Sequence, residues 1–205
     1  MPVILLIRHG ENEYVKKGRL AGRLPGVHLN ARGQEQAALL AERLGGAPIR
    51  AIYSSPLERT QETAAPLARA LGLEVASCPG LIEVDFGEWQ DQKIKGLSRT
   101  KPWKIVQGAP SAFRFPGGET FAEAQLRIVG ELRRLAEQHE AQALIACVSH
   151  SDPIKLAIAY FIGLPLDMFQ RLSVSPGSVS ALALGEMGGR LLSLNYEFSF
   201  TLSKP

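Results

Sequence analysis

The sequence predicts a single α/β domain over residues 1–205. Two apolar runs, residues 3–7 and 143–148, lack the alternation of half-buried strands and are typical of strands buried on both faces of a parallel sheet. Segments with helical spacing of apolar residues lie between the apolar runs. A chain of 205 residues is long enough for one well-buried core, and neither repeats nor a linker divide it.

In the first 78 residues, turn signals separate three strands from two helices. Asn30 is suited to cap a helix whose apolar residues recur at helical spacing, and Gly45 is suited to end it. Pro56 is typical of the first turn of a second helix. The expected elements are strands over residues 3–7, 49–53 and 73–76 and helices over residues 31–44 and 56–71.

The second part begins with an irregular segment, residues 79–118, which contains several Gly and Pro residues. Long segments of this kind are often lids over binding sites, and we expect a lid here. A helix over residues 119–139 follows, with an expected apolar stripe of Phe121, Leu126, Val129, Leu132 and Leu135. The last expected elements are a strand over 143–148, a helix over 152–162, and two β-rich runs, 179–184 and 191–196, with a turn at 186–189.

Composition and charge exclude several classes of protein. The net charge is +3, but basic residues are interleaved with acidic ones, so we expect no nucleic-acid partner. No apolar stretch approaches the roughly 18–20 residues of a membrane helix, and the first residues do not resemble a signal peptide. The two cysteines, Cys78 and Cys147, do not form a disulfide framework. We therefore expect a cytoplasmic protein with no membrane partner.

Two histidines follow apolar runs that end in the same way. Arg8 and His9 follow residues 3–7, and His150 follows residues 143–148. Because α/β sheets bind ligands at the carboxyl ends of their strands, both imidazoles are expected at one site. Arg59, early in a helix that follows a strand, can reach the same edge. Two guanidinium groups and two imidazoles suit a phosphate dianion, although each residue alone is also explained as a surface arginine or a core histidine.

A metal site is the alternative, since histidine is a common metal ligand. The sequence contains neither a His-Glu-x-x-His motif nor cysteine pairs at metal-ligand spacing. Two fixed positive charges would also oppose a divalent cation. We therefore expect no metal and no other cofactor.

Phosphoryl transfer also requires an acid that protonates the departing oxygen. Residues 81–89 offer three candidates, Glu83, Asp85 and Glu88. Glu83 is flanked by Ile82 and Val84, and partial burial would raise the pKa of its carboxyl group. Spacing alone does not choose among the three, and a solvated loop acid is the alternative for each.

Five segments in order resemble the histidine phosphatase superfamily, in its phosphoglycerate-mutase-like branch. They are Arg8-His9-Gly10-Glu11, residues 29–37 (LNARGQEQA), residues 53–64 (YSSPLERTQETA), residues 81–89 (LIEVDFGEW) and Val148-Ser149-His150. The resemblance covers residues 3–185. It implies one three-layer α/β/α domain, a mostly parallel central sheet and no metal cofactor.

The resemblance also implies roles for individual residues. His9 matches the nucleophile that becomes phosphohistidine, and Arg8, Arg59 and His150 match the groups around the phosphoryl oxygens. Glu83 matches the proton donor. A neutral His9 can attack phosphorus with one nitrogen only if an acceptor, expected to be a backbone carbonyl, holds the other. Residues 116–119 resemble the family's turn into its penultimate helix.

Several positions depart from the family pattern or lie outside its catalytic centre. Asn12 stands where most members have Ser or Thr, and Val15 where many have an Asn that contacts phosphate, so the Asn12 amide is a candidate substitute. Ser151 replaces a Gly and is a candidate helix cap and anion contact. Gly22 and Arg23 fall where the family contacts the rest of its substrate, and Arg23 is either a ligand for a carboxylate or second phosphate or a surface residue.

Three aromatic residues of the lid, Trp89, Trp103 and Phe113, are candidates for a pocket wall, with core or lid packing as the more common role.

The sequence thus predicts a metal-independent phosphatase that hydrolyses a small phosphorylated metabolite through a phosphohistidine on His9. A phosphoglycerate-type mutase is the first alternative, but the segment between Glu83 and His150 is short for the lid insertion that such mutases usually carry. A non-catalytic phosphate-binding module is the second alternative. Candidate substrates are sugar phosphates, phosphoglycerates, nucleotides and cofactor precursors such as ribazole phosphate. Family resemblance also suggests a homodimer.

Overall fold

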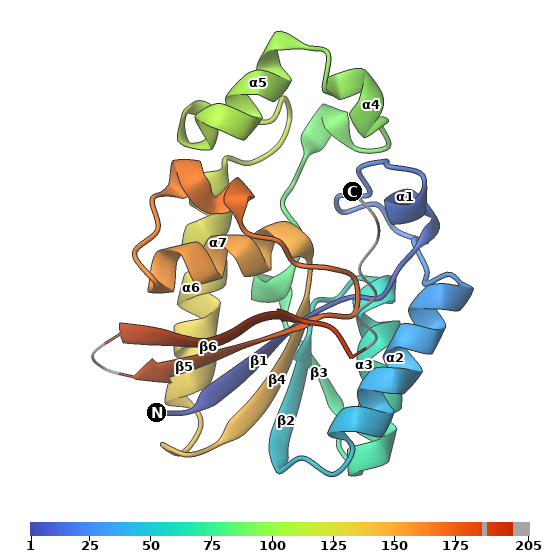
Figure 1. Ribbon diagram of the computed structural model, residues 1–205, viewed down its shortest axis with the longest axis vertical. Coiled ribbons are helices and arrows are strands. Elements are labelled where there is room, and N and C mark those ends of the chain that lie inside the picture. The colour runs from blue at the N-terminus through green and yellow to red at the C-terminus, as the bar shows by residue number, and fades with distance from the viewer. Residues whose placement is uncertain (186–187, 199–205) are drawn as a thin grey trace.

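The computed structural model describes residues 1–185 and 188–198 and shows a six-stranded sheet between two layers of helices (Figure 1). The strands are β1 (Val3–Arg8), β2 (Ile49–Ser54), β3 (Val75–Ser77), β4 (Leu144–Ser149), β5 (Val179–Gly185) and β6 (Gly188–Tyr196). Their order is β3-β2-β4-β1-β5-β6. The pairs β3–β2, β2–β4 and β4–β1 are parallel, and the pairs β1–β5 and β5–β6 are antiparallel. The predicted three-layer α/β/α fold with a mostly parallel sheet is confirmed.

Helices cover both faces of the sheet and one of its ends (Figure 1). On one face lie α2 (Ala31–Leu44) and α3 (Glu58–Leu71), and on the other α6 (Phe121–Glu137) and α7 (Ser151–Phe161). Three shorter helices, α1 (Glu13–Lys16), α4 (Ile94–Leu97) and α5 (Lys101–Gly108), lie beyond the carboxyl end of β1. The 3₁₀-helices cover Pro79–Leu81, Gly87–Trp89, Pro110–Ala112 and Leu166–Arg171. None of the described helices has the length and apolar character that a membrane crossing requires.

The side chains of β1 show why its sequence does not alternate. Ile4 and Leu6 pack into the core on the α6 and α7 side, whereas Leu5 and Ile7 pack into the core on the α2 and α3 side. Because successive side chains of a strand point to opposite faces, a strand covered on both faces must be apolar at every position.

Helix boundaries follow the capping signals of the sequence. The Asn30 side chain accepts a hydrogen bond from the Gly33 N–H at 2.9 Å, and α2 has the predicted bounds. The second predicted helix begins at Glu58 rather than Pro56. Thr120 and Glu123 form a capping box, so α6 begins at Phe121.

Two expectations are wrong in detail. The segment 79–118 is not irregular throughout, since α4 and α5 lie within it; both are too short for helical periodicity to show in the sequence. Leu126 does not belong to the apolar stripe of α6, since it is 70% exposed and the buried face is made by Ala124 and Ile128 with the other predicted residues. Residues 186–187 of the predicted turn lie outside the described residues, and residues 188–189 belong to β6, which begins before the predicted position 191.

The pairing of β1 with β4 brings the two histidines to one edge. The strands are parallel and Arg8 lies opposite Ser149, so the next residues, His9 and His150, leave the sheet together. The His9 N–H continues the pairing and donates to the Ser149 carbonyl at 3.0 Å.

The loop after β1 is pressed against the first turn of α2. A Cβ on Gly33 would lie 2.0 Å from the Glu11 carbonyl oxygen, and one on Gly10 would lie 2.6 Å from the Gly33 carbonyl oxygen. Backbone atoms cannot yield as a flexible side chain can. The close approach therefore requires glycine at both positions.

We expect Gly33→Ala to lower the free energy of unfolding by about 1–3 kcal/mol, because the backbone must shift. Gly130→Ala in α6 is the matched control. A Cβ there meets nothing within 4 Å, so better helix propensity should stabilise the protein by about 0.5–1 kcal/mol. Urea denaturation of both variants measures the difference, and equal stabilities would contradict the close-packing argument.

Candidate active site

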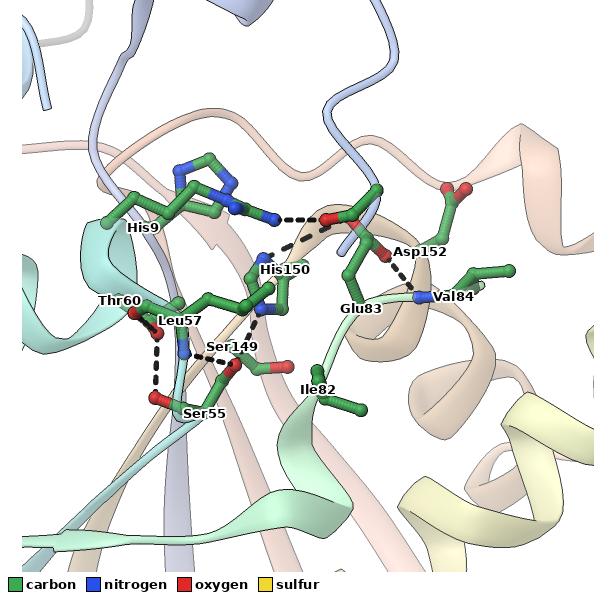
Figure 2. Close-up of polar contacts among 12 residues, drawn as sticks. His9, Ser55, Leu57, Thr60, Ile82, Glu83, Val84, Ser149, His150 and Asp152 are labelled. Carbon is green, nitrogen blue, oxygen red and sulfur yellow. Dashed lines mark hydrogen bonds and ion pairs between the residues drawn. The ribbon is translucent and has the colours of Figure 1, made fainter. Parts of the chain in front are cut away.

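A cavity of about 340 Å³ opens at the edge where β1 and β4 end. Its lining includes the predicted residues Arg8, His9, Asn12, Gly22, Arg59, Glu83 and Ser151. Figure 2 shows His9, His150 and Glu83 converging from the ends of β1 and β4 and from the loop before Val84. The structure brings the two imidazoles together at this edge of the sheet, and their predicted roles stay predictions.

His9 is held in one orientation by the backbone carbonyl of the next residue, Gly10. The ring Nδ1 lies 2.7 Å from the Gly10 carbonyl oxygen, which can only accept, so Nδ1 carries the hydrogen and Nε2 keeps a free lone pair. Burial lowers the pKa of His9 well below its usual value, and the charges of Arg59 and Arg8 lower it further. The ring is therefore neutral near pH 7 and can act as a nucleophile through Nε2.

His150 faces His9 with ring centroids 5.2 Å apart. Its Nε2 lies 2.9 Å from the Ser55 hydroxyl oxygen, which accepts weakly from the Leu57 N–H at 3.4 Å and keeps its own hydrogen to donate. When the hydroxyl donates to Nε2, the His150 ring hydrogen lies on Nδ1, which is 4.0 Å from a carboxylate oxygen of Glu83. Burial, followed by the charge of Arg59, lowers the pKa of His150 well below its usual value.

Arg59 is buried and Arg8 is partly buried, and each guanidinium group is anchored by one carbonyl. Arg8 Nη1 donates to the Val174 oxygen at 2.6 Å, and Arg59 Nη2 donates to the Gly22 oxygen at 2.7 Å. Several other buried nitrogens have no hydrogen-bond partner among the described residues: Arg8 Nε, Arg59 Nε and Nη1, Asn12 Nδ2 and His150 Nδ1. Buried donors normally find acceptors. A ligand with several anionic oxygens would supply them.

Glu83 provides a buried acid beside these donors. Its side chain accepts from the Val84 N–H at 2.9 Å, and the residue is 8% exposed. Burial, reinforced by the negative charge of Asp152, raises the pKa of Glu83 to about 7, against the opposing effects of the Val84 hydrogen bond and the two arginines. Asp85 and Glu88, the other candidates, do not line the cavity.

The backbone of Glu83 is held by a second ionic cluster. Arg23 Nε donates to the Glu83 carbonyl oxygen at 2.9 Å, and Arg127 Nη2 approaches the same oxygen at 3.4 Å. Both guanidinium groups also bind one carboxylate oxygen of Glu119, at 2.8 and 2.7 Å. Arg23 pairs with Asp85 as well, at 3.6 Å, and does not line the cavity. Its geometry is that of a support for Glu83, and its predicted substrate contact stays untested.

The positions that depart from the family pattern lie around the cavity. The Asn12 oxygen caps α1 by accepting from the Val15 N–H at 2.9 Å, which leaves the amide nitrogen as the group available to an anion. Val15 lines the cavity with an apolar side chain. Ser151 does not cap α7, because His150 occupies the N-cap position and Ser151 is the first helical residue.

Sequence reasoning missed three residues of the site. Asp152 lines the cavity and forms an ion pair with Lys155 at 2.7 Å. Ser55 orients His150, and Arg127 supports Glu83. Two of these residues could have been predicted as members of the site from their positions, since Asp152 lies two residues after His150 and Ser55 directly follows a strand. No local pattern distinguishes Arg127 from other helical arginines.

The donor set does not resemble a metal centre. Within the described residues, no three His, Cys, Asp or Glu side chains are grouped so that they could hold a metal ion. The fold and the buried cationic pocket define an α/β protein with a site for a phosphate-like anion.

Comparison with known proteins assigns the family. The model of the histidine phosphatase superfamily (branch 1) matches residues 4–197. Phosphoserine phosphatase 1 of Hydrogenobacter thermophilus is 32% identical over 197 residues, covering 95% of this chain and 92% of that protein. The chain belongs to the histidine phosphatase superfamily.

Two further relatives show the range of activities. A protein of Enterobacter sp. named as a probable phosphoglycerate mutase, GpmB, is 30% identical over 182 residues, covering 87% of this chain and 83% of that protein. The structure of the alpha-ribazole phosphatase from Shigella flexneri is 30% identical with a TM-score of 0.83, covering 95% of this chain and 96% of that chain. The predictions of this family, of an enzyme and of a histidine-phosphatase function are confirmed.

We expect the Glu83 carboxyl to titrate near pH 7 in the ligand-free protein, and Asp152→Asn to lower that pKa, because removal of a negative charge favours the carboxylate. Carbon-13 NMR of glutamate-labelled protein, assigned with Glu83→Gln, measures it. Glu123 is the control: its pKa is lowered to about 2 by Arg114, and Asp152→Asn should leave it there. An unchanged or higher Glu83 pKa in Asp152→Asn would contradict the assignment.

Proposed function

We propose that this protein hydrolyses a small phosphate monoester without a metal ion, through a phosphohistidine on His9. The observation that supports the proposal most is that Arg8, Asn12 and Arg59 carry buried donors without partners in the described part of the chain and line the same cavity as a neutral His9 whose Nε2 is free. A phosphoryl group bound to them would lie next to the nucleophile. Fixed cations at the phosphoryl oxygens supply most of the stabilisation in this chemistry.

In the first step, His9 Nε2 forms a bond to phosphorus and the phosphorus–oxygen bond of the ester breaks. Protonated Glu83 gives its proton to the departing alkoxide oxygen, so a neutral alcohol leaves. The positive charges of Arg8 and Arg59 balance the charge on the phosphoryl oxygens. N–H groups of Asn12 and His150 donate hydrogen bonds to the same oxygens. The Gly10 carbonyl stabilises the positive charge of phosphorylated His9 by accepting from Nδ1.

In the second step, water attacks the phosphohistidine and the phosphorus–nitrogen bond breaks. The Glu83 carboxylate accepts a proton from the attacking water and returns to its acidic form. Inorganic phosphate and neutral His9 result, and the cycle closes with atoms and charges balanced.

A phosphomutase is the second candidate, favoured by the similarity to the probable phosphoglycerate mutase. A mutase must exclude water from phospho-His9, and the helices of the lid, α4 and α5, contain only 4 and 8 residues. We therefore favour hydrolysis. A cytoplasmic location fits the two unpaired, buried cysteines, Cys78 and Cys147. The homodimer and the single domain over residues 1–205 stay predictions.

His9→Ala should abolish release of inorganic phosphate from p-nitrophenyl phosphate and from a panel of phosphorylated metabolites, because the nucleophile is gone. Wild-type turnover should resist EDTA. Rapid quenching of wild type with a labelled ester should trap an acid-labile, alkali-stable phosphoenzyme that His9→Ala lacks. The control is His28→Ala, which removes an exposed histidine paired with Glu62. Labelled His9→Ala protein would contradict the proposal, and a complete lack of turnover and label would favour the binding module.

Glu83→Gln should lower kcat/KM for an alkyl phosphate by roughly 10²–10⁴-fold, because the alkoxide then leaves unprotonated. The loss with p-nitrophenyl phosphate should be much smaller, since nitrophenolate leaves without a proton. For wild type, kcat/KM with the alkyl ester should fall as the pH rises through the Glu83 pKa of about 7, where the acid loses its proton. Exposed Glu88→Gln is the control, and an unchanged alkyl-ester rate in Glu83→Gln would exclude Glu83 as the acid.

A further inference from the structure

The outer part of the cavity differs in character from its catalytic end. Its walls come from the segment after β1, from α4 and α5, and from the 3₁₀-helix 166–171, which lie away from the sheet. The apolar lining residues there are Val15, Leu20, Ala21, Phe86, Ile94 and Trp103. Two neutral amides, Gln107 and Gln170, complete the wall. The leaving group of an ester bound at His9 would extend into this part.

The cation of the outer wall is already paired. Arg19 lines the cavity, but its Nε and Nη2 both donate to the Asp91 carbonyl oxygen, at 3.1 and 2.7 Å, and Nη2 also lies 2.5 Å from the Asp91 carboxylate. Arg23 is held by Glu119 and Asp85, as described above. The lysines of the lid, at positions 93, 95, 101 and 104, are not among the lining residues.

A charged leaving group would therefore be poorly compensated. A carboxylate or second phosphate placed against Val15, Ile94 or Trp103 would lose water without gaining an uncommitted cation. Among the described lining residues, the other cations are Arg8 and Arg59, which the reacting phosphoryl group would occupy. The outer wall thus disfavours a second anion.

One aromatic side chain of this wall, Trp103, is supported by a second ring behind it. Trp103 stacks on Trp89 with ring centroids 6.1 Å apart and an interplanar angle of 18°. Trp89 is buried and packs against Phe113 and Phe115 with centroids 5.2 and 5.3 Å away. Core packing therefore accounts for Trp89 and Phe113, whereas Trp103 has one ring face supported and also lines the cavity. A preorganised aromatic surface binds an apolar group with little loss of side-chain entropy.

Gln170 adds a donor for a neutral polar atom. Its carbonyl oxygen accepts from Lys155 Nζ at 2.8 Å, which leaves its amide hydrogens available. Lys155 is itself paired with Asp152, so the ammonium charge is compensated.

We propose that the ester cleaved here has an uncharged leaving alcohol with an apolar or aromatic group that lies against Trp103. This inference rests on the proposed hydrolysis and narrows its substrate class. Phosphohydroxy acids and bisphosphates, whose leaving groups are anionic, are poor substrates on this account. Wall residues act here as specificity determinants, and none takes part in the bond-breaking steps.

Benzyl phosphate and 4-carboxybenzyl phosphate test the proposal, because they share a reacting centre and differ by one remote charge. We expect kcat/KM to be at least about tenfold higher for benzyl phosphate, with phosphoserine and 3-phosphoglycerate also below it. Equal or faster turnover of 4-carboxybenzyl phosphate, phosphoserine or 3-phosphoglycerate would overturn the proposal.

Three variants test whether the outer wall sets the preference for an uncharged leaving group. Trp103→Ala should reduce kcat/KM for benzyl phosphate by about tenfold and hardly affect methyl phosphate, and Trp103→Phe should retain most of the preference. Arg19→Gln should change the rates for benzyl and 4-carboxybenzyl phosphate by the same factor. Two results would contradict the role proposed for the outer wall. One is an equal loss of kcat/KM for benzyl and methyl phosphate in both Trp103 variants. The other is a loss in Arg19→Gln that affects only 4-carboxybenzyl phosphate.

Two phosphonates that carry the same aromatic groups separate this inference from the proposed hydrolysis. Benzylphosphonate and 4-carboxybenzylphosphonate have phosphorus–carbon bonds that are not hydrolysed, so calorimetric titration measures binding alone. Tighter binding of benzylphosphonate to wild type supports the uncharged leaving group even if no ester is cleaved. Equal or tighter binding of the carboxylate overturns it even if hydrolysis is confirmed.

Discussion

Two guanidinium groups buried beside two imidazoles are the constraint on which the rest of the structure depends. Burial of a charge is costly unless hydrogen bonds replace water, and like charges placed together add to the cost. Arg8 and Arg59 each obtain one carbonyl acceptor, from Val174 and Gly22, residues far from them in sequence. Those two segments must therefore close over the edge of the sheet. Both arginines line the cavity and keep buried N–H groups that have no partner among the described residues.

The same charges set the protonation states of their neighbours. The arginine charges lower the pKa values of His9 and His150, as burial does, and both effects keep the imidazoles neutral. For Glu83 the effects oppose each other, because the arginines favour the carboxylate whereas burial and Asp152 favour the acid. Burial and Asp152 prevail. A neutral nucleophile and a neutral acid can therefore coexist within a strongly cationic pocket.

The parts of the fold that the sequence predicts best are those with local signals. An uninterrupted apolar run defines β1, and Asn30 and Gly45 define the ends of α2. Helices α4 and α5 were missed because one or two turns show no periodicity. Leu126 was placed on the buried face because it is apolar, although a step of five residues from Phe121 rotates it about 140° around the helix.

The candidate site could be predicted only in part, because only some of its residues have a local sequence signal. His9 and His150 directly follow strands, so they could be paired from their positions alone. The choice of Glu83 over Asp85 came from family resemblance, and burial next to Asp152 supplies its physical basis. The contacts of Arg23 and Arg127 with Glu83 span 60 and 44 residues. No local pattern encodes partners so distant.

In the proposed reaction one carboxyl group must give a proton in the first step and accept one in the second. A strongly acidic group would perform only the second role, and a very weak acid only the first. A pKa of about 7 allows Glu83 to perform both near neutral pH. Arg23, Arg127 and Glu119 hold its backbone in place while the proton moves. The ionic cluster behind Glu83 thus belongs to the chemistry of the site as much as to its stability.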